Sequence, residues 1–187
     1  IVEAWGDPKA IIFPRSSCKM LQALPLLESG AADRFGLTAA QLALACASHN
    51  GAHIHTDAVA SWLDGIGLAE PDLRCGTQMP DDPPARKELT CSDTSPCQLH
   101  NNCSGKHAGF LTLTKHLGAG PEYVEPGHAV QKAVRTAFEE VTGEASPGYG
   151  IDGCSAPNFA TSVHGLARAM STFAAANPEG STRDRAA

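Results

Sequence analysis

Apolar residues recur at helical spacing in several parts of the chain, and the clearest case is Val130, Val134 and Phe138 at i, i+4 and i+8. Plausible caps bound these stretches, with Thr38 before one of them and Gly30 after another. The pattern predicts helices over residues 16–30, 39–47, 55–66, 105–117, 128–141 and 157–176.

Strand signals are fewer and shorter. Two apolar runs, at residues 1–2 and 10–13, flank a Gly-Asp-Pro turn and predict a hairpin or a strand–turn–strand unit. Residues 75–97 are rich in Pro, Asp and Thr and predict a long surface loop, while residues 143–153 predict turns. Helices therefore dominate, and we expect an α/β (α+β) fold with helices around a small sheet.

The composition is that of a folded protein. Hydrophobic residues make up 42% of the chain and charged residues 18%, a balance that supplies a core and argues against disorder. The net charge is −6 and no basic stripe is visible, which argues against a nucleic-acid partner. No apolar run approaches the ~20 residues that a membrane span needs, and no signal peptide is visible, so we expect no membrane partner.

The chain has seven cysteines, an odd number with irregular spacing, which favours a reducing compartment over a disulfide framework. Cys46 and Cys75 are expected as small buried hydrophobes, whereas Cys91 and Cys97 could pair. Five histidines are expected at the surface or as caps: His53, His55, His116, His128 and His164.

Ser16 and Lys19 form an S-x-x-K spacing at the start of a predicted helix. Because positions i and i+3 share a helix face, Lys19 can take the serine proton if burial or a nearby charge lowers its pKa. Serine β-lactamases and penicillin-binding proteins use this arrangement. The spacing also occurs by chance, with a capping Ser and a solvated Lys.

Residues 101–107 place amide, hydroxyl, thiol, amine and imidazole groups directly before an apolar helix. The helix dipole there lowers a thiol pKa, and Cys103 and Lys106 share one face by their i, i+3 spacing. A turn capped by Ser104 is the alternative, but packing alone does not require so many polar groups. We therefore expect a functional site in this segment.

Two further turns carry candidate chemistry. Asp152 and Cys154 precede the last predicted helix, where an acid beside a thiol can bind a metal, or where the Asp simply caps the helix. Ser48 ends another helix and is a candidate nucleophile or a plain cap. Cys103 and Cys154 do not have zinc-finger spacing, but two thiolates with one unusual ligand and a water would form an open zinc site.

Taken together, five stretches resemble the Rhizobium-type L-asparaginase family, also called L-asparaginase II. They occur in the order of the family and span most of the chain. In sequence they read FPRSSCK (13–19), QALPL (22–26), ALACASH (43–49), LHNNCSGKHAG (99–109) and DGC (152–154).

The resemblance implies a fold like that of serine β-lactamases and glutaminases. It also implies hydrolysis of L-asparagine to L-aspartate and ammonia by a cytoplasmic homodimer that contains zinc. The site residues that it implies are catalytic Ser16, Lys19 and Ser48; polar Arg15, His107 and Asp152; and the zinc ligands Cys103, Lys106 and Cys154, with water completing the shell.

The chain departs from the family in several places. Ser155 stands where the family leads us to expect Gly, and Gln78 stands where we expect His. The family chain is roughly twice as long, and the lysine that partners the Ser48 position lies in its later half. We therefore expect a single catalytic domain over residues 1–187, truncated at both ends and not necessarily active as a fragment.

The expected chemistry is acyl transfer, in which Ser16 or Ser48 attacks the side-chain amide and Lys19 moves the proton. The residues leave open which serine attacks first. Two alternatives remain at this point. A glutaminase- or β-lactamase-like serine hydrolase would not need Cys103 and Cys154, and a non-enzymatic zinc or thiol module would unfold without its metal.

Overall fold

The computed structural model describes residues 1–187, which form a helix-rich structure with two small antiparallel sheets. The elements in chain order are β1 (Ile11–Ile12), η1 (Arg15–Cys18), α1 (Lys19–Glu28), α2 (Ala31–Arg34), α3 (Ala39–Cys46), α4 (His53–Gly65), η2 (Glu70–Asp72), α5 (Pro83–Cys91), η3 (Gln98–His100), α6 (Ser104–Leu117), α7 (Ala129–Thr142), β2 (Tyr149–Ile151), β3 (Pro157–Phe159), β4 (Thr161–Ser162), α8 (Val163–Ala174) and α9 (Thr182–Ala186), where η marks a 3₁₀ helix.

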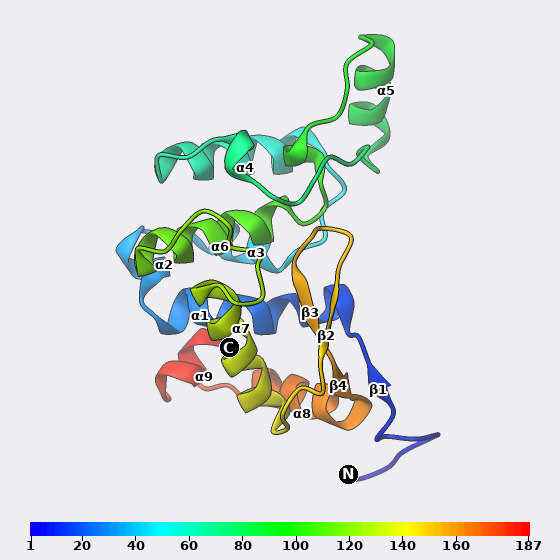
Figure 1. Cartoon of the computed structure of the whole chain (residues 1–187), viewed down its shortest axis with the longest axis vertical. Coiled ribbons are helices and arrows are strands. Elements are labelled where there is room, and N and C mark those ends of the chain that lie inside the picture. The colour runs from blue at the N-terminus through cyan, green and yellow to red at the C-terminus, as the bar shows by residue number, and fades with distance from the viewer.

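The helices pack around α1, which contacts α3 and α6 on one side and α7 on another (Figure 1). Their apolar faces form one core that includes the fully buried Leu21 and Leu24 of α1, together with Trp62 and Phe138. The predicted helices over 16–30, 39–47, 55–66, 105–117 and 128–141 are confirmed within a few residues. None of the helices is both long and apolar enough to span a bilayer.

The strands lie to one side of the helices (Figure 1). β1 pairs with β4, where Ile11 lies opposite Ser162, and β2 pairs with β3, where Tyr149 lies opposite Phe159. The predicted N-terminal hairpin is wrong, because residues 1–2 are exposed and form no strand while β1 pairs near the other end of the chain. The fold class is therefore mixed α and β, as predicted.

The predicted helix over residues 157–176 is also wrong in its first third. Residues 157–162 form β3 and β4, and α8 begins only at Val163. The side chain of Ser162 accepts the Gly165 N–H and so caps α8 at this point. The backbone before Ser162 is held in strand pairing, and this tertiary pairing overrides the local helical composition.

The predicted surface loop at 75–97 contains a helix that the pattern missed. Asp82 accepts the Ala85 N–H, and Pro83 and Pro84 occupy the first turn, where a missing N–H costs nothing. The resulting helix, α5, extends away from the rest of the molecule at one end (Figure 1). Likewise, the turns predicted at 143–153 contain β2.

Candidate active site

Lys19 is the first residue of α1, and its side chain reaches the segment that follows α3. Its Nζ donates hydrogen bonds to Ser48 Oγ at 2.8 Å and to the Ala47 carbonyl at 2.6 Å. Lys19 is 2% exposed, whereas Ser48 is exposed at the surface above it. The structure thus brings together two predicted catalytic residues from different elements.

Burial is the largest influence on Lys19, and it lowers the pKa of the amino group below its usual value. A buried ammonium is disfavoured because it loses hydration, so the neutral amine is populated at lower pH than for a free lysine. A neutral amine beside a hydroxyl can accept its proton. This pair therefore has the chemistry of a base and a nucleophile.

His49 holds the backbone beside Ser48, a role that the sequence did not reveal. Its N–H donates to the Asn102 carbonyl at 3.2 Å, and its ring bonds Ser104 Oγ at 2.8 Å. Because Nδ1 accepts the Gly51 N–H, the other ring nitrogen carries the proton and donates to Ser104. His49 therefore ties the Ser48 segment to the start of α6.

A close approach of α3 and α6 sets this arrangement. A Cβ on Gly105 would lie 2.4 Å from the Leu44 carbonyl oxygen, so only glycine fits at this position. On the next turn, Gly109 has ordinary contact distances of 3.4 Å or more. Gly105 thus allows α6 to bring Asn102 and Cys103 next to the end of α3.

Ser16 lies in η1 and forms no side-chain hydrogen bond. It lines a polar cavity of about 200 Å³, which adjoins the Lys19 pair through Asn102, whose carbonyl lies 3.5 Å from Lys19 Nζ. The residues around the cavity are Arg15, Ser16, Gln78, Asn101, Asn102, Cys103, Asp152, Gly153 and Cys154.

Arg15 and Asp152 both line this cavity and form an ion pair with 3.1 Å between the guanidinium and the carboxylate. The guanidinium is exposed, whereas the carboxylate is mostly buried. Asn158 anchors both, because its side chain accepts the Arg15 N–H and donates to Asp152. Arg15 has φ +52, a strained backbone conformation for a residue with a side chain. Ser155 also has φ +66, which explains why glycine is expected there.

Cys103 and Cys154 line the cavity, and Lys106 contacts Cys154. Lys106 Nζ lies 3.2 Å from Cys154 Sγ, and all three side chains are more than nine-tenths buried. A hydrogen bond from Cys103 lowers the pKa of Cys154 and raises that of Cys103. Burial lowers the pKa of Lys106, but the sulfur charges outweigh burial and raise it overall.

This donor set suits a soft divalent ion. Zinc binds thiolates and nitrogen donors, and the Cys154 thiol, whose pKa is lowered, is buried beside a second thiol and an amine. No group of three His, Cys, Asp or Glu side chains clusters anywhere, so a site here needs Lys106 as the third ligand. Lys106 would have to lose a proton to bind a metal.

His107 lies behind this cluster and is completely buried. Burial lowers its pKa to about 4, so the ring is neutral at pH 7. Its Nδ1 lies 2.8 Å from the hydroxyl of Tyr123, a residue that the sequence gave no reason to single out.

All seven cysteines of the chain are free, so Cys91 and Cys97 do not pair. Cys75 is buried as predicted, whereas Cys46 is half-buried. His128 caps α7 by accepting the Val130 N–H, as predicted for a capping histidine. His55 is half-buried and stacks on His49 at 5.1 Å.

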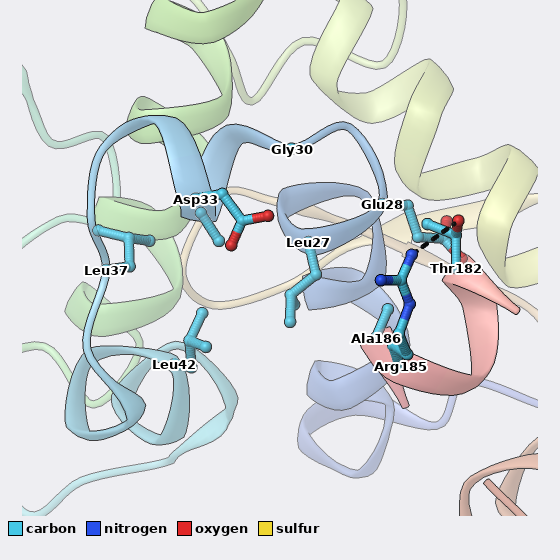
Figure 2. Close-up of a pocket in the computed structure, with 10 residues that line it drawn as sticks. Leu27, Glu28, Gly30, Asp33, Leu37, Leu42, Thr182, Arg185 and Ala186 are labelled. Atoms are coloured by element: carbon cyan, nitrogen blue, oxygen red, sulfur yellow. Dashed lines mark hydrogen bonds between the residues drawn. The ribbon is translucent and has the colours of Figure 1, made fainter. Parts of the chain in front are cut away.

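Another cavity, of about 320 Å³, lies between α1, α2 and α9 (Figure 2). Leu27, Leu37 and Leu42 line it together with Asp33 and Arg185. None of the predicted site residues lines this cavity. The polar cavity beside Lys19 and Ser48 is therefore the candidate active site.

The model of one protein family, L-asparaginase II, matches residues 1–187. A comparison with curated proteins gave no match. The family match covers every segment that builds the polar cavity, and it agrees with the resemblance of the five motifs. The chain belongs to the L-asparaginase II family.

Proposed function

We propose that the protein hydrolyses the side-chain amide of L-asparagine to L-aspartate and ammonia, with Ser48 as nucleophile and Lys19 as base. Family membership supports the reaction class. The observation that carries the assignment of roles is the 2.8 Å hydrogen bond between the buried Lys19 amine and the exposed Ser48 hydroxyl. Ser16 has no such base, which favours Ser48 as the residue that attacks.

In the acylation step, Ser48 Oγ adds to the amide carbon while its proton moves to neutral Lys19. The resulting ammonium then gives this proton to the amide nitrogen, and ammonia leaves as the C–N bond breaks. The enzyme is left as a Ser48 ester of the aspartyl side chain, with Lys19 neutral again.

Water completes the reaction by the reverse sequence of proton transfers. Lys19 takes a proton from the water as its oxygen adds to the ester carbon, and it returns that proton to Ser48 Oγ when the ester bond breaks. The product is aspartate, and both residues regain their starting protonation states.

The two ends of the Arg15–Asp152 pair match the charges of a free amino acid. We assign Arg15 to the α-carboxylate of the substrate, because a guanidinium binds a carboxylate with two parallel hydrogen bonds. Asp152 then accepts the α-ammonium group. Both charges line the cavity next to the Ser48 segment, which supports a small zwitterionic substrate.

We propose that Cys103, Lys106 and Cys154 hold a zinc ion, as their chemistry and mutual contact support. Bound there, zinc would act as a Lewis acid that orients and polarises polar groups in the cavity. The serine β-lactamase-like fold and the homodimer also remain proposals.

The test compares ammonia release by the wild type with that of Ser48→Ala, Ser16→Ala and Ser17→Ala. We expect a loss of at least ~10³-fold in kcat for Ser48→Ala, as for removal of other catalytic serines. The matched control is Ser17→Ala, because Ser17 is exposed and its hydroxyl bonds only the Pro14 carbonyl.

Full activity of Ser48→Ala together with loss in Ser16→Ala would assign the nucleophile to Ser16. A parallel assay with L-glutamine and with a β-lactam separates the proposed activity from the related serine hydrolases. Turnover of either compound at a higher kcat/KM than L-asparagine would overturn the substrate assignment.

A further inference from the structure

Gln78 lines the cavity, and no step of the proposed reaction uses it. It lies in the segment between η2 and α5, and it is half-buried. Its Oε1 accepts the Asn102 N–H at 3.2 Å. Because only the oxygen of a side-chain amide accepts an N–H, this hydrogen bond fixes which end of the Gln78 amide faces Asn102 and leaves Nε2 at the other end.

The free end of this amide is a hydrogen-bond donor. Gln78 Nε2 carries two N–H groups, and it makes no hydrogen bond within the chain. It does not belong to the side-chain atoms that are buried without a partner, so solvent reaches it. Since Gln78 lines the cavity, this donor is available to a molecule bound there.

The backbone that carries Gln78 is anchored on both sides. Before it, the Asn101 side chain donates to the Gly76 carbonyl at 3.2 Å. After it, the Asp82 N–H donates to the Asn50 carbonyl at 2.9 Å. A donor on a fixed backbone needs little rearrangement when charge develops next to it, which is the condition for stabilising a transition state electrostatically.

A single residue connects this donor to the Ser48 segment. Asn102 bonds Gln78 through its N–H, and its carbonyl accepts the N–H of His49, the residue after Ser48, at 3.2 Å. Lys19 Nζ also lies 3.5 Å from that carbonyl. Gln78 is therefore next to the Ser48–Lys19 pair, and Asn102 lies between them.

The chemistry of the substrate indicates which atom this donor meets. In the proposed function, Arg15 and Asp152 bind the α-carboxylate and the α-ammonium group, which leaves the side-chain amide for Ser48. The hydrogen-bond acceptor of that amide is its carbonyl oxygen, and this oxygen becomes negatively charged when Ser48 adds to the carbon. A neutral N–H group can donate to it in both states.

We propose that Gln78 Nε2 donates a hydrogen bond to the carbonyl oxygen of the scissile amide and stabilises the oxyanion that forms there. Gln78 is then a catalytic residue at its nitrogen, while its oxygen holds the Asn102 backbone. This role rests on the proposed function, because it requires that Ser48 attacks an amide. It does not depend on the zinc ion.

Two variants separate the two ends of the Gln78 amide. Gln78→Glu keeps an oxygen for the Asn102 N–H and removes the donor, whereas Gln78→Met removes both and adds no charge. Because both lack the donor, we expect each to lower kcat for L-asparagine by ~10²–10³-fold, with KM changed by less than about threefold. The melting temperature should fall by ~2–4 °C in Gln78→Met alone, because only there does the Asn102 N–H lose its acceptor.

The matched control for added charge is Met79→Glu, which places a carboxylate on the neighbouring exposed residue and leaves the Gln78 amide intact. We expect its kcat to stay within about twofold of wild type, since solvent screens an exposed charge. If Gln78→Met keeps the kcat of the wild type while both carboxylate variants lose activity, added charge is the cause and the proposal is overturned. A loss confined to KM in the Gln78 variants would also overturn it.

The wild type separates this proposal from the one on which it rests. A wild type that releases no ammonia from L-asparagine would overturn the proposed function and the role of Gln78 together. An active wild type with equally active Gln78→Glu and Gln78→Met would overturn the role of Gln78 alone.

Discussion

Lys19 and Lys106 are both buried, yet their pKa values shift in opposite directions. Burial lowers both, but Lys106 contacts the Cys154 sulfur directly, and the negative charge more than compensates for its lost hydration. Lys19 instead donates hydrogen bonds to the Ser48 hydroxyl and to backbone carbonyls, and the nearby Cys103 sulfur raises its pKa by less than burial lowers it. The neighbours of each amine therefore suit Lys19 to act as a base and Lys106 to remain charged in the absence of a metal.

This contrast predicts the pH dependence of catalysis. Because Lys19 must be neutral to accept a proton, kcat/KM should rise with pH and level off above the lowered pKa of Lys19, below the 10.5 of a free lysine. Lys19→Arg keeps the positive charge at every accessible pH, so we expect a loss of at least ~10²-fold that high pH does not rescue. A pH–rate profile of both proteins checks this, and recovery of the Arg variant at high pH would contradict it.

At the scale of elements, the site depends on the junction of α3 and α6. α3 leads into Ser48, and the start of α6 carries Cys103 and Lys106, so the distance between these helices sets the distance between the two groups. Gly105 permits that distance because its Cα lies against the Leu44 carbonyl. The junction is thus a structural requirement with a direct effect on chemistry.

Gly105→Ala should push the two helices apart. We expect a destabilisation of about 1–3 kcal/mol, typical of overpacking, together with lower kcat. Gly109→Ala is the matched control in the same helix, where a Cβ has room and the higher helix propensity of Ala should leave stability equal or improved. Denaturant unfolding and ammonia release measure both effects, and equal behaviour of the two variants would refute the packing argument.

Glu144 anchors β4 to the end of α7. Its carboxylate accepts hydrogen bonds from the Ser162 N–H, the Thr161 hydroxyl and the Ser162 hydroxyl. These bonds favour the ionised form and lower the pKa of Glu144 below 4.5, with the Ser162 N–H as the largest cause. Because the pKa of Glu144 is lower in the folded than in the unfolded protein, its ionised form stabilises the fold above about pH 4.5. This stabilisation is lost as the pH falls through the pKa of Glu144 in the folded protein.

Glu144→Gln should therefore destabilise the protein at pH 7 by about 1.5–3 kcal/mol, the range for hydrogen bonds to a charged group. The difference from wild type should shrink below pH 4.5, as the wild-type carboxylate also becomes neutral. Urea unfolding at pH 7 and pH 3.5 measures this, and a difference that stays constant would show that ionisation of Glu144 is not the cause.

At the scale of the whole molecule, most of the core does not depend on the proposed metal site. Only two residues of the 29-residue buried cluster, Cys103 and Cys154, belong to that site. The rest packs among the helices, with α1 between its neighbours (Figure 1). This distribution argues against a module that folds only around its metal.

Removing the metal from a zinc-loaded protein should therefore abolish or reduce activity before the fold is lost. We expect circular dichroism to keep its helical signal after chelation, while ammonia release falls and recovers when zinc is restored. Unfolding in step with metal loss would favour the structural zinc module. Cys154→Ser, which removes one ligand, should behave like the chelated wild type.

The sequence by itself determined the family, the five central helices and the identity of most groups around the cavity. These features follow from local periodicity and from short motifs such as the Ser16–Lys19 spacing, which need no knowledge of distant contacts. Only the tertiary structure decided that Lys19 bonds Ser48, that β1 pairs with β4, and that Tyr123 contacts His107. The partners in each of these contacts are separated along the chain. The contacts form when the helices and strands pack against one another, and no local sequence pattern encodes that packing.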